Sequence, residues 1–211
     1  MADSIDNKNK IVKYTNKLGN TSDSNKMQIY QKKILFYGGA VITKNDSEYV
    51  SSAIAYEGKA PGLQVQLLDS NNSTKTYVVI FSVGDEIFSG LTEFANKYNI
   101  TGAHFTAIGA MSKGTLGWYS PEKKAYKKIH IDGQAEICSL IGNIALYNGK
   151  PVVHAHTVVA PNDGITKGGH LIEGYVWPTL EVFVTVESNP ILKSFDDKTG
   201  LVLINPNPNK T

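Results

Sequence analysis

Residues 139–159 read SLIGNIALYNGKPVVHAHTVV, and this stretch decides the fold. Two apolar, β-branched runs flank the pair Asn148-Gly149, which is the sequence that a type I′ hairpin turn favours. The stretch therefore predicts two antiparallel neighbouring strands. Because side chains alternate along a strand, His154 and His156 are expected on one face of the second strand, with Cα atoms about 6.5–7 Å apart.

Strand-like runs occur on both sides of this hairpin. The turn-forming sequence SNNST at residues 70–74 separates the first two runs and favours another antiparallel hairpin. The predicted strands cover residues 63–69, 75–83, 102–112, 114–120, 124–131, 135–147, 151–160, 170–176 and 180–187.

One helix is predicted, over Asp85–Tyr98. Ser82 or Asp85 is expected to cap its first turn. One amphipathic helix with six or more strands predicts an α+β domain, with a mostly antiparallel β-sheet flanked by one or a few helices. The apolar stripe of the helix consists of Ile87, Leu91, Phe94, Ala95 and Tyr98.

The composition limits the classes of partner. All 21 basic residues are lysine, and the chain contains no arginine. Arginine makes the bidentate contact that reads guanine, whereas lysine neutralises phosphate as a point charge. With a net charge of +2, the sequence does not support specific DNA reading. The single cysteine, Cys138, excludes an intramolecular disulfide framework and a cysteine-rich zinc module.

The chain is expected to consist of a leader, a domain and a tail. Residues 1–50 are predicted to be a flexible, lysine-rich leader, with a nucleic-acid-binding arm as the alternative. Its first 33 residues hold seven lysines and three aspartates, a net charge of +4, so the remainder carries −2. The domain is expected at residues 51–190 and the C-terminal tail at 191–211.

An export signal beginning at Met27 is the alternative to a flexible leader in this part of the chain. Its apolar run, Ile34–Ile42, is only nine residues long and contains two glycines, and a polar stretch separates it from the small residues Ala53–Ala55. No apolar stretch approaches the ~20 residues that span a bilayer. We therefore expect a cytoplasmic protein without a membrane partner, with export as the alternative.

A third histidine follows the histidine pair after a glycine-rich loop. Residues 161–169 read PNDGITKGG, whose glycines allow the chain to turn back so that His170 starts a strand beside the first one. Three neutral imidazoles facing one point form the ligand set of a zinc site whose fourth position is left to water or a ligand. We therefore predict a divalent metal site, with zinc as the expected ion, at His154, His156 and His170.

Other interpretations of the histidine pair stay open. Such a pair on a half-buried strand can serve structure alone, hydrogen-bonded to backbone or water. Metal-assisted hydrolysis or lyase chemistry would need a general base, for which Asp163 in the loop and Glu173 are candidates. Glu173 is expected on the face of its strand opposite His170. Asp163, Gly168, Gly169 and Glu173 are retained as candidate residues of a ligand pocket.

The other two histidines and the absence of known catalytic motifs limit the kinds of site that the sequence can form. His104 lies inside a strand-like run and His130 ends a lysine-rich one, so both are expected to be structural. A cupin-type oxygenase also uses two histidines at this spacing, but it adds a glutamate a few residues later. Here TVVAPN, residues 157–162, follows the pair, and no such glutamate is present. The sequence also lacks a GxSxG elbow, a P-loop and a dinucleotide fingerprint.

The segments GQAEICSLIGNIAL (133–146) and GKPVVHAHTVVAPNDGITKGGHLIEGYVWPTLEVFV (149–184) resemble the plant and prokaryote conserved (PPC) domain. The resemblance covers about residues 62–186. It implies an antiparallel sheet flanked by helices, assembly as a homotrimer, and metal-site histidines at the three positions named above. Plant members carry the domain after an AT-hook, and stand-alone prokaryotic members are often labelled predicted DNA-binding proteins.

The sequence departs from this family in two places. The partner-recruiting segment of plant members, Gly-Arg-Phe-Glu-Ile-Leu, aligns with Gly133–Cys138, where Gln134 replaces arginine, Ala135 phenylalanine and Cys138 leucine. The AT-hook core cannot exist without arginine. The leading hypothesis is therefore a trimeric metal-binding module with a small-ligand or regulatory role. A metal-dependent hydrolase or lyase and a DNA-binding adaptor are the alternatives. Four aromatic residues are expected either to anchor the trimer interface or to pack in the core: Trp118, Tyr119, Tyr175 and Trp177.

Overall fold

The computed structural model describes residues 48–51, 58–71 and 74–206. The predicted leader, except for its last three residues, lies outside this part of the chain, as do the apolar run and the small-residue site of the export-signal alternative. The described residues belong to two compact units, of which the smaller contains residues 48–51, 119–127 and 198–200. Among the described residues, no helix is long and apolar enough to cross a membrane.

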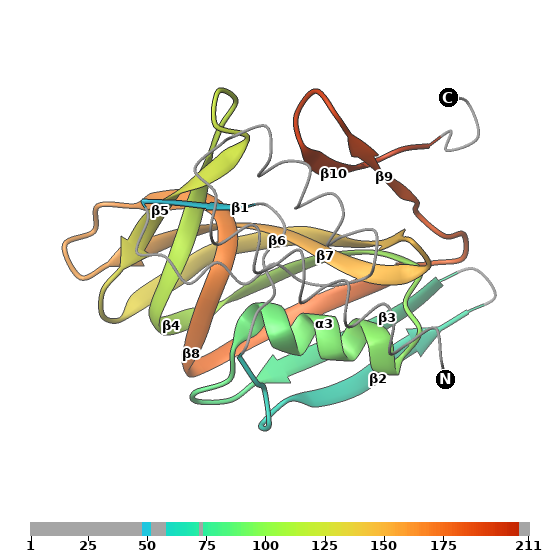
Figure 1. The fold of residues 1–211 in the computed structure, drawn as a ribbon. Coiled ribbons are helices and arrows are strands. Elements are labelled where there is room, and N and C mark those ends of the chain that lie inside the picture. Colours follow the sequence, from blue (N-terminus) through green and yellow to red (C-terminus); the bar gives the residue numbers. More distant parts are fainter. Residues whose placement is uncertain (1–47, 52–57, 72–73, 207–211) are drawn as a thin grey trace, which may run out of the picture. The chain divides into compact units, whose positions relative to one another are not determined.

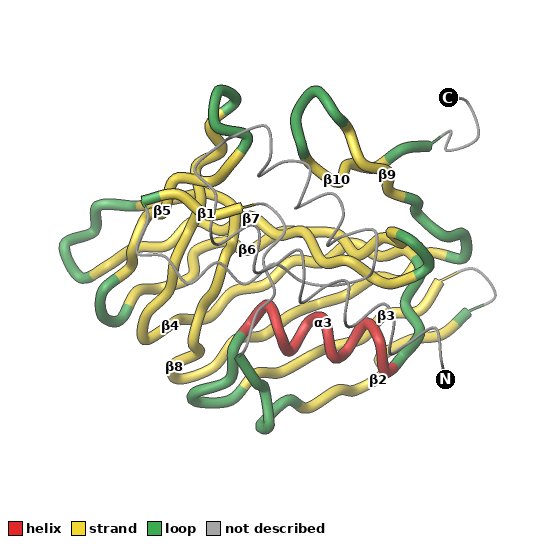
Figure 2. The backbone as a smooth tube through the Cα atoms, viewed as in Figure 1, coloured by secondary structure: helices red, strands yellow, loops and turns green. Residues whose placement is uncertain are grey.

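The larger unit is built on antiparallel strands, as the sequence predicted (Figure 1). The strands are β2 (Gln64–Ser70), β3 (Thr74–Phe81), β4 (Gly102–Ser120), β6 (Ala135–Tyr147), β7 (Lys150–Pro161) and β8 (Lys167–Glu187). The pairings β4–β6, β6–β7, β7–β8 and β8–β4 form a closed circuit, and β8 continues along β3, which pairs with β2. One helix, α3 (Ile87–Lys97), accompanies these strands in the described part of the chain (Figure 2).

The smaller unit is a strand pair with polar and aromatic contacts. Strand β1 (Tyr49–Ser51) pairs antiparallel with the first three residues of β5 (Ala125–Ile131). The rings of Tyr119 and Tyr126 meet edge to face, with centroids 5.6 Å apart. Burial raises the pKa of the Tyr126 hydroxyl. These contacts join the described residues of this unit.

Strands β4 and β8 are each longer than predicted. Residues 102–112 and 114–120 were expected as two strands but form the single strand β4, and residues 170–176 and 180–187 both belong to β8. The β4–β8 pairing shifts register at three points, and such bulges let paired strands bend without ending. Pro178 lies between the registered pairs of Val176 and Leu180, within β8.

The turn at Asn148-Gly149 confirms the predicted hairpin. Both residues have positive φ, 50° and 74°, as a type I′ turn requires. The turn pairs Tyr147 with Lys150, so β6 and β7 are antiparallel neighbours over their whole length. The predicted hairpin of β2 and β3 is confirmed as well.

The predicted helix is present as α3 (Ile87–Lys97), but its cap differs from the prediction. Neither Ser82 nor Asp85 caps it. The Asp85 carboxylate accepts hydrogen bonds from the amides of Gly62 and Ser82, so it is committed to the preceding turn. Glu86 is the N-cap instead and accepts from the amides of Phe88 and Ser89.

The predicted apolar stripe of α3 packs into the core of the larger unit. Its four most deeply buried apolar residues are fully inaccessible to solvent and belong to the same core cluster as buried residues of β3, β4, β7 and β8. Tyr77, Phe94 and Tyr98 form an aromatic cluster with ring centroids 5.1–5.5 Å apart. This burial of aromatic and aliphatic surface holds the helix against the sheet.

The C-terminal segment that was expected to be a tail contains a hairpin of β9 (Lys193–Asp196) and β10 (Leu201–Ile204). The backbone just before β9 joins the larger unit, because the amide of Leu146 on β6 donates to the carbonyl of Ile191 at 2.8 Å. An isolated bridge also links Leu146 with Leu192. These bonds fix where β9 begins.

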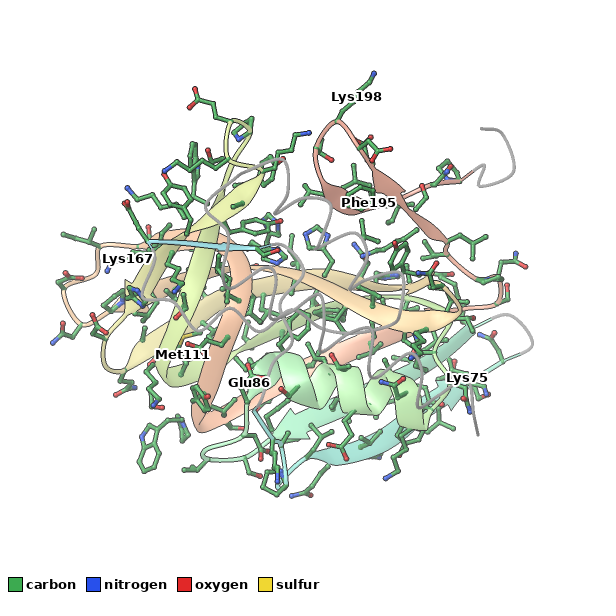
Figure 3. All side chains as sticks on the ribbon, viewed as in Figure 1. Lys75, Glu86, Met111, Lys167, Phe195 and Lys198 are labelled. Carbon is green, nitrogen blue, oxygen red and sulfur yellow. The ribbon has the colours of Figure 1, made fainter. Side chains whose placement is uncertain are left out.

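Glu86 joins the helix to the sheet, and its removal should destabilise the protein. Figure 3 labels Glu86, which lies at the start of α3. Its buried carboxylate also accepts from the Gly174 amide of β8 at 3.1 Å. Glu86→Ala leaves three backbone N–H groups without this acceptor, so we expect a loss of about 3 kcal/mol in the free energy of unfolding. Urea unfolding followed by circular dichroism measures it. Glu93→Ala, on the exposed face of α3, serves as the control, and an equal loss in both variants would contradict the capping role.

Candidate metal centre

Side chains along β7 alternate between the two faces of the sheet, so core residues and histidines lie on opposite faces. Val153 and Ala155 are buried in the core, whereas His154 is half-buried and His156 exposed on the other face. Thr157 shares the inner face, where its hydroxyl donates to the carbonyl of Ser139. The two histidines therefore share one face of the strand, as the sequence predicted.

The loop after β7 brings the third histidine back to the pair. His156 and His170 are direct cross-strand partners in the β7–β8 pairing. One possible ligand atom from each of His154, His156 and His170 lies within 4.8 Å of the other two. The ring centroids are 5.1, 5.1 and 5.6 Å apart. Among the described residues, this is the group of histidine, cysteine or acidic side chains close enough together to hold one ion.

Burial keeps these imidazoles neutral. Desolvation lowers the pKa of His170 to about 3, with further contributions from the other two histidines and from Lys193. Desolvation likewise lowers the pKa of His154 to about 4, again with Lys193 and His156 contributing. The pKa of His156 is lowered by burial as well. At neutral pH all three rings are uncharged and offer a lone pair, which is the form that binds a metal ion.

Lys193 is a charged residue of this site that the sequence did not predict. It is the first residue of β9 and only 8% exposed. Its ammonium is close enough to His154 and His170 to lower the pKa of both rings. Burial lowers the pKa of Lys193 itself to about 8, so the group is still mainly protonated at pH 7. A single lysine in a polar segment carries no sequence signal for such a position.

Asn143 is a second polar residue that the sequence did not predict. It is the direct cross-strand partner of His154 on β6, and directly opposite residues of an antiparallel pair share a face of the sheet. Its Oδ1 is buried and has no hydrogen-bond partner within the described part of the chain. A neutral amide therefore lies beside the histidine cluster with acceptor capacity to spare.

The two candidate carboxylates have partners of their own. Asp163 accepts a hydrogen bond from the amide of Ile165 at 2.9 Å, which is the Asx-turn geometry of a loop residue. Glu173 accepts from the hydroxyl of Thr115 at 3.0 Å. Neither carboxylate belongs to the histidine cluster. Their part in a ligand pocket remains a hypothesis.

The two candidate glycines serve the backbone in different ways. A Cβ on Gly169 would lie 2.6 Å from the carbonyl oxygen of Gly117, so a side chain there would push β8 away from β4. Gly168 would meet only ordinary contacts, at 3.4 Å from β7. Gly169 therefore lets β8 come close to β4 next to His170, whose register partner on β4 is Gly117.

The other histidines lie on the surface. His104 is exposed on β4, and its Nδ1 is 3.2 Å from a carboxylate oxygen of Glu187. His130 is exposed at the end of β5, and its carbonyl accepts from the ammonium of Lys167. Neither belongs to the histidine cluster.

The four aromatic residues considered as interface anchors divide into two pairs. Trp118 and Trp177 are at least half exposed and so lie outside the core. Tyr119 donates its hydroxyl to the carbonyl of Thr199, and Tyr175 lies beneath the ammonium of Lys113, 4.9 Å from the ring centroid. The two tryptophans are thus available for contacts outside the chain.

The lowered pKa of His170 predicts an acid-sensitive stability. Unfolding restores its ordinary pKa of 6.5, so the unfolded chain binds more protons than the folded chain from about pH 6.5 down to about pH 3. In metal-free protein we expect this residue alone to reduce the free energy of unfolding by about 2 kcal/mol between pH 7 and pH 5. Urea midpoints in the presence of a chelator measure the effect. His170→Asn should flatten the pH dependence and His104→Asn should not; equal slopes in the two variants would contradict burial as the cause.

Known proteins similar to this chain were found by sequence profile and by structure. The sequence profile of the Plants and Prokaryotes Conserved (PCC) domain matches residues 68–188. A PPC protein of Pyrococcus horikoshii is 34% identical, with a TM-score of 0.59 and coverage of 67% of this chain and 94% of that chain. A search of curated proteins finds no match.

Two further solved structures are similar. A metal-containing protein of Archaeoglobus fulgidus is 31% identical, with a TM-score of 0.55 over 72% of this chain and 98% of that chain. A Bacteroides thetaiotaomicron protein with a suggested DNA-binding role is 27% identical, with a TM-score of 0.62 over 67% of this chain and 96% of that one. The profile match spans more than half of the sequence and includes all three clustered histidines, so the chain belongs to the Plants and Prokaryotes Conserved (PCC) domain family, also abbreviated PPC.

Proposed function

We propose that this protein binds one divalent metal ion through His154, His156 and His170 and acts as a small-ligand or regulatory module. The observation that carries the proposal is the convergence of three neutral imidazoles on one face of the β7–β8 pair. The metal-containing relative from Archaeoglobus fulgidus adds support from outside the chain.

The donor set fits zinc. Zinc favours imidazole nitrogens at 2.0–2.1 Å, and two such ligands on one tetrahedral ion lie about 3.4 Å apart. The present spacing of up to 4.8 Å needs only small rotations of the rings to reach that value. Other imidazole-favouring ions, such as copper or nickel, would compete on geometry and availability. Three protein ligands leave one tetrahedral position for water or a small ligand.

A homotrimer is proposed as the assembled form, as the family resemblance implies. Exposed apolar side chains support a subunit interface on the histidine-bearing face of the sheet. Ile141 and Phe183, 54% and 50% exposed, lie in one cross-strand row with His156. Ile108 and Val158 are also exposed and lie next to this row. We call Ile108, Ile141, Val158 and Phe183 the apolar patch; such contiguous exposed surface marks an interaction site.

An enzymatic role is the second candidate. Hydrolysis or lyase chemistry at the metal would need a base, and Asp163 and Glu173 each have a hydrogen-bond partner outside the cluster. A binding module requires no such base. The binding role is therefore preferred.

A DNA-binding role is the third candidate, and the suggested role of the Bacteroides relative favours it. Phosphate contacts by the chain's lysines would supply affinity but little sequence information. Because the chain has no arginine, the guanine-reading contact is not available to it. A strong salt dependence of any binding to duplex DNA would be its signature.

Metal analysis tests the proposed centre. Protein purified without added metal should contain about one divalent ion per chain by inductively coupled plasma mass spectrometry. The double variant His154→Ala/His156→Ala should lose it, because two of the three ligands are gone. His104→Ala, which removes a surface histidine, should keep the full content. Equal metal in the double variant and the wild type would refute the site.

Sedimentation tests the proposed interface. We expect the wild type to sediment as an assembly of three 23.0 kDa chains. Ile141→Glu/Phe183→Glu should shift it to a monomer, because the six added carboxylates of a trimer, two from each chain, would have to be buried at the interfaces. Val83→Glu is the matched control, since Val83 is 54% exposed but lies between β3 and α3. A double variant that still sediments as a trimer would exclude the apolar patch as the interface.

A further inference from the structure

We propose that Lys193 completes the histidine cluster as an anion-binding group, so that the ligand of this site is a small carboxylate held between the metal ion and the Lys193 ammonium. The inference rests on the proposed metal centre and deepens it, because it names the chemical class of the ligand. It assigns a role to a residue of β9 that lies outside the family segment at residues 68–188.

The position of Lys193 is fixed by the backbone that precedes it. Ile191 and Leu192 are joined to Leu146 on β6 by a hydrogen bond and by a β-bridge. Strand β6 also carries Asn143, the register partner of His154. The chain therefore enters β9 beside the strand that borders the histidine cluster. The Lys193 side chain is buried, and its charge is within electrostatic range of His154 and His170.

The Lys193 side chain has no counter-charge among the described residues. Only 8% of the residue is exposed, and its ammonium forms no hydrogen bond or ion pair within the part of the chain that the structure describes. A buried ammonium without a partner is costly, because desolvation penalises the charge and nothing offsets it. We infer that the Lys193 ammonium pairs with a ligand that is not part of the described chain.

The metal ion would increase the imbalance. Three neutral imidazoles do not reduce the charge of a divalent ion, so ion and ammonium together bring about three positive charges into one half-buried site. The polar neighbour Asn143 is a neutral amide. Glu187 lies on the same face of the sheet, but it pairs with His104, which is itself two strands away from His154. An anion is the ligand that this charge distribution favours.

A carboxylate matches the site better than a larger anion. One of its oxygens can occupy the open metal position while the other accepts a charge-assisted hydrogen bond from Lys193. The metal ion and the Lys193 ammonium would then bind the same carboxylate, so the lysine would act together with the histidines and not in place of one of them. The unused Oδ1 of Asn143 is an acceptor for which a hydroxyl on that ligand would be a suitable donor.

Cobalt-loaded protein provides the test, because the visible spectrum of Co²⁺ reports an exchange at its open coordination position. Titration with acetate should change the spectrum of the wild type, and titration with neutral acetamide should change it far less. Lys193→Met should bind one cobalt ion per chain as the wild type does, but its dissociation constant for acetate should rise at least about tenfold, since one charge-assisted hydrogen bond is lost. Lys167→Met removes an exposed lysine of β8 and should leave the acetate affinity within about twofold.

The possible results separate the two proposals. No cobalt bound by the wild type would defeat the metal centre itself. Full cobalt binding in Lys193→Met with unchanged acetate affinity would overturn the role of Lys193 and leave the metal centre intact. A wild type that responds equally to acetate and acetamide would also overturn it. Methionine has a similar length and no charge, so the folded state is expected to persist; if it does not, Lys193→Gln is used with the same criteria.

Discussion

The register that places His156 opposite His170 is the constraint on which the site depends. A strand that slips by one residue turns every side chain to the other face, so a shift of β8 would move His170 away from the pair and into the core. Two features fix the register. First, β8 pairs with β7 over four residues and also pairs with β4 along most of its length. Second, Gly169 allows β8 to approach Gly117 on β4 closely. The histidine cluster is thus held by the same hydrogen bonds that close the circuit of strands.

Local chemistry explains what the sequence could predict. The Asn148-Gly149 turn depends on two residues that accept positive φ, and the common face of His154 and His156 depends only on strand alternation. The apolar stripe of α3 follows from helical spacing. The placement of His170 needed one further step, the return of a glycine-rich loop, and the structure brings that residue to the pair.

Features that depend on contacts between distant parts of the chain could not be predicted from the sequence. Asp85 is drawn away from the helix by an amide 23 residues earlier, at Gly62, so Glu86 caps α3 instead. The bulges that merge predicted strands into β4 have no local signature. Lys193 reaches the histidines only because Leu146 and Leu192 meet. In each case a tertiary contact decides between residues that look equivalent along the sequence.

The hairpin of β9 and β10 divides the site into two parts along the chain. The three histidines lie within residues 68–188, the segment shared with the family, whereas Lys193 follows that segment by five residues. Under the two proposals, a change in the C-terminal hairpin alters which ligand is selected without disturbing the strands that carry the histidines. The site is modular in this sense: the closed circuit of strands carries the proposed metal ligands, and an appended segment carries the lysine proposed to select the ligand.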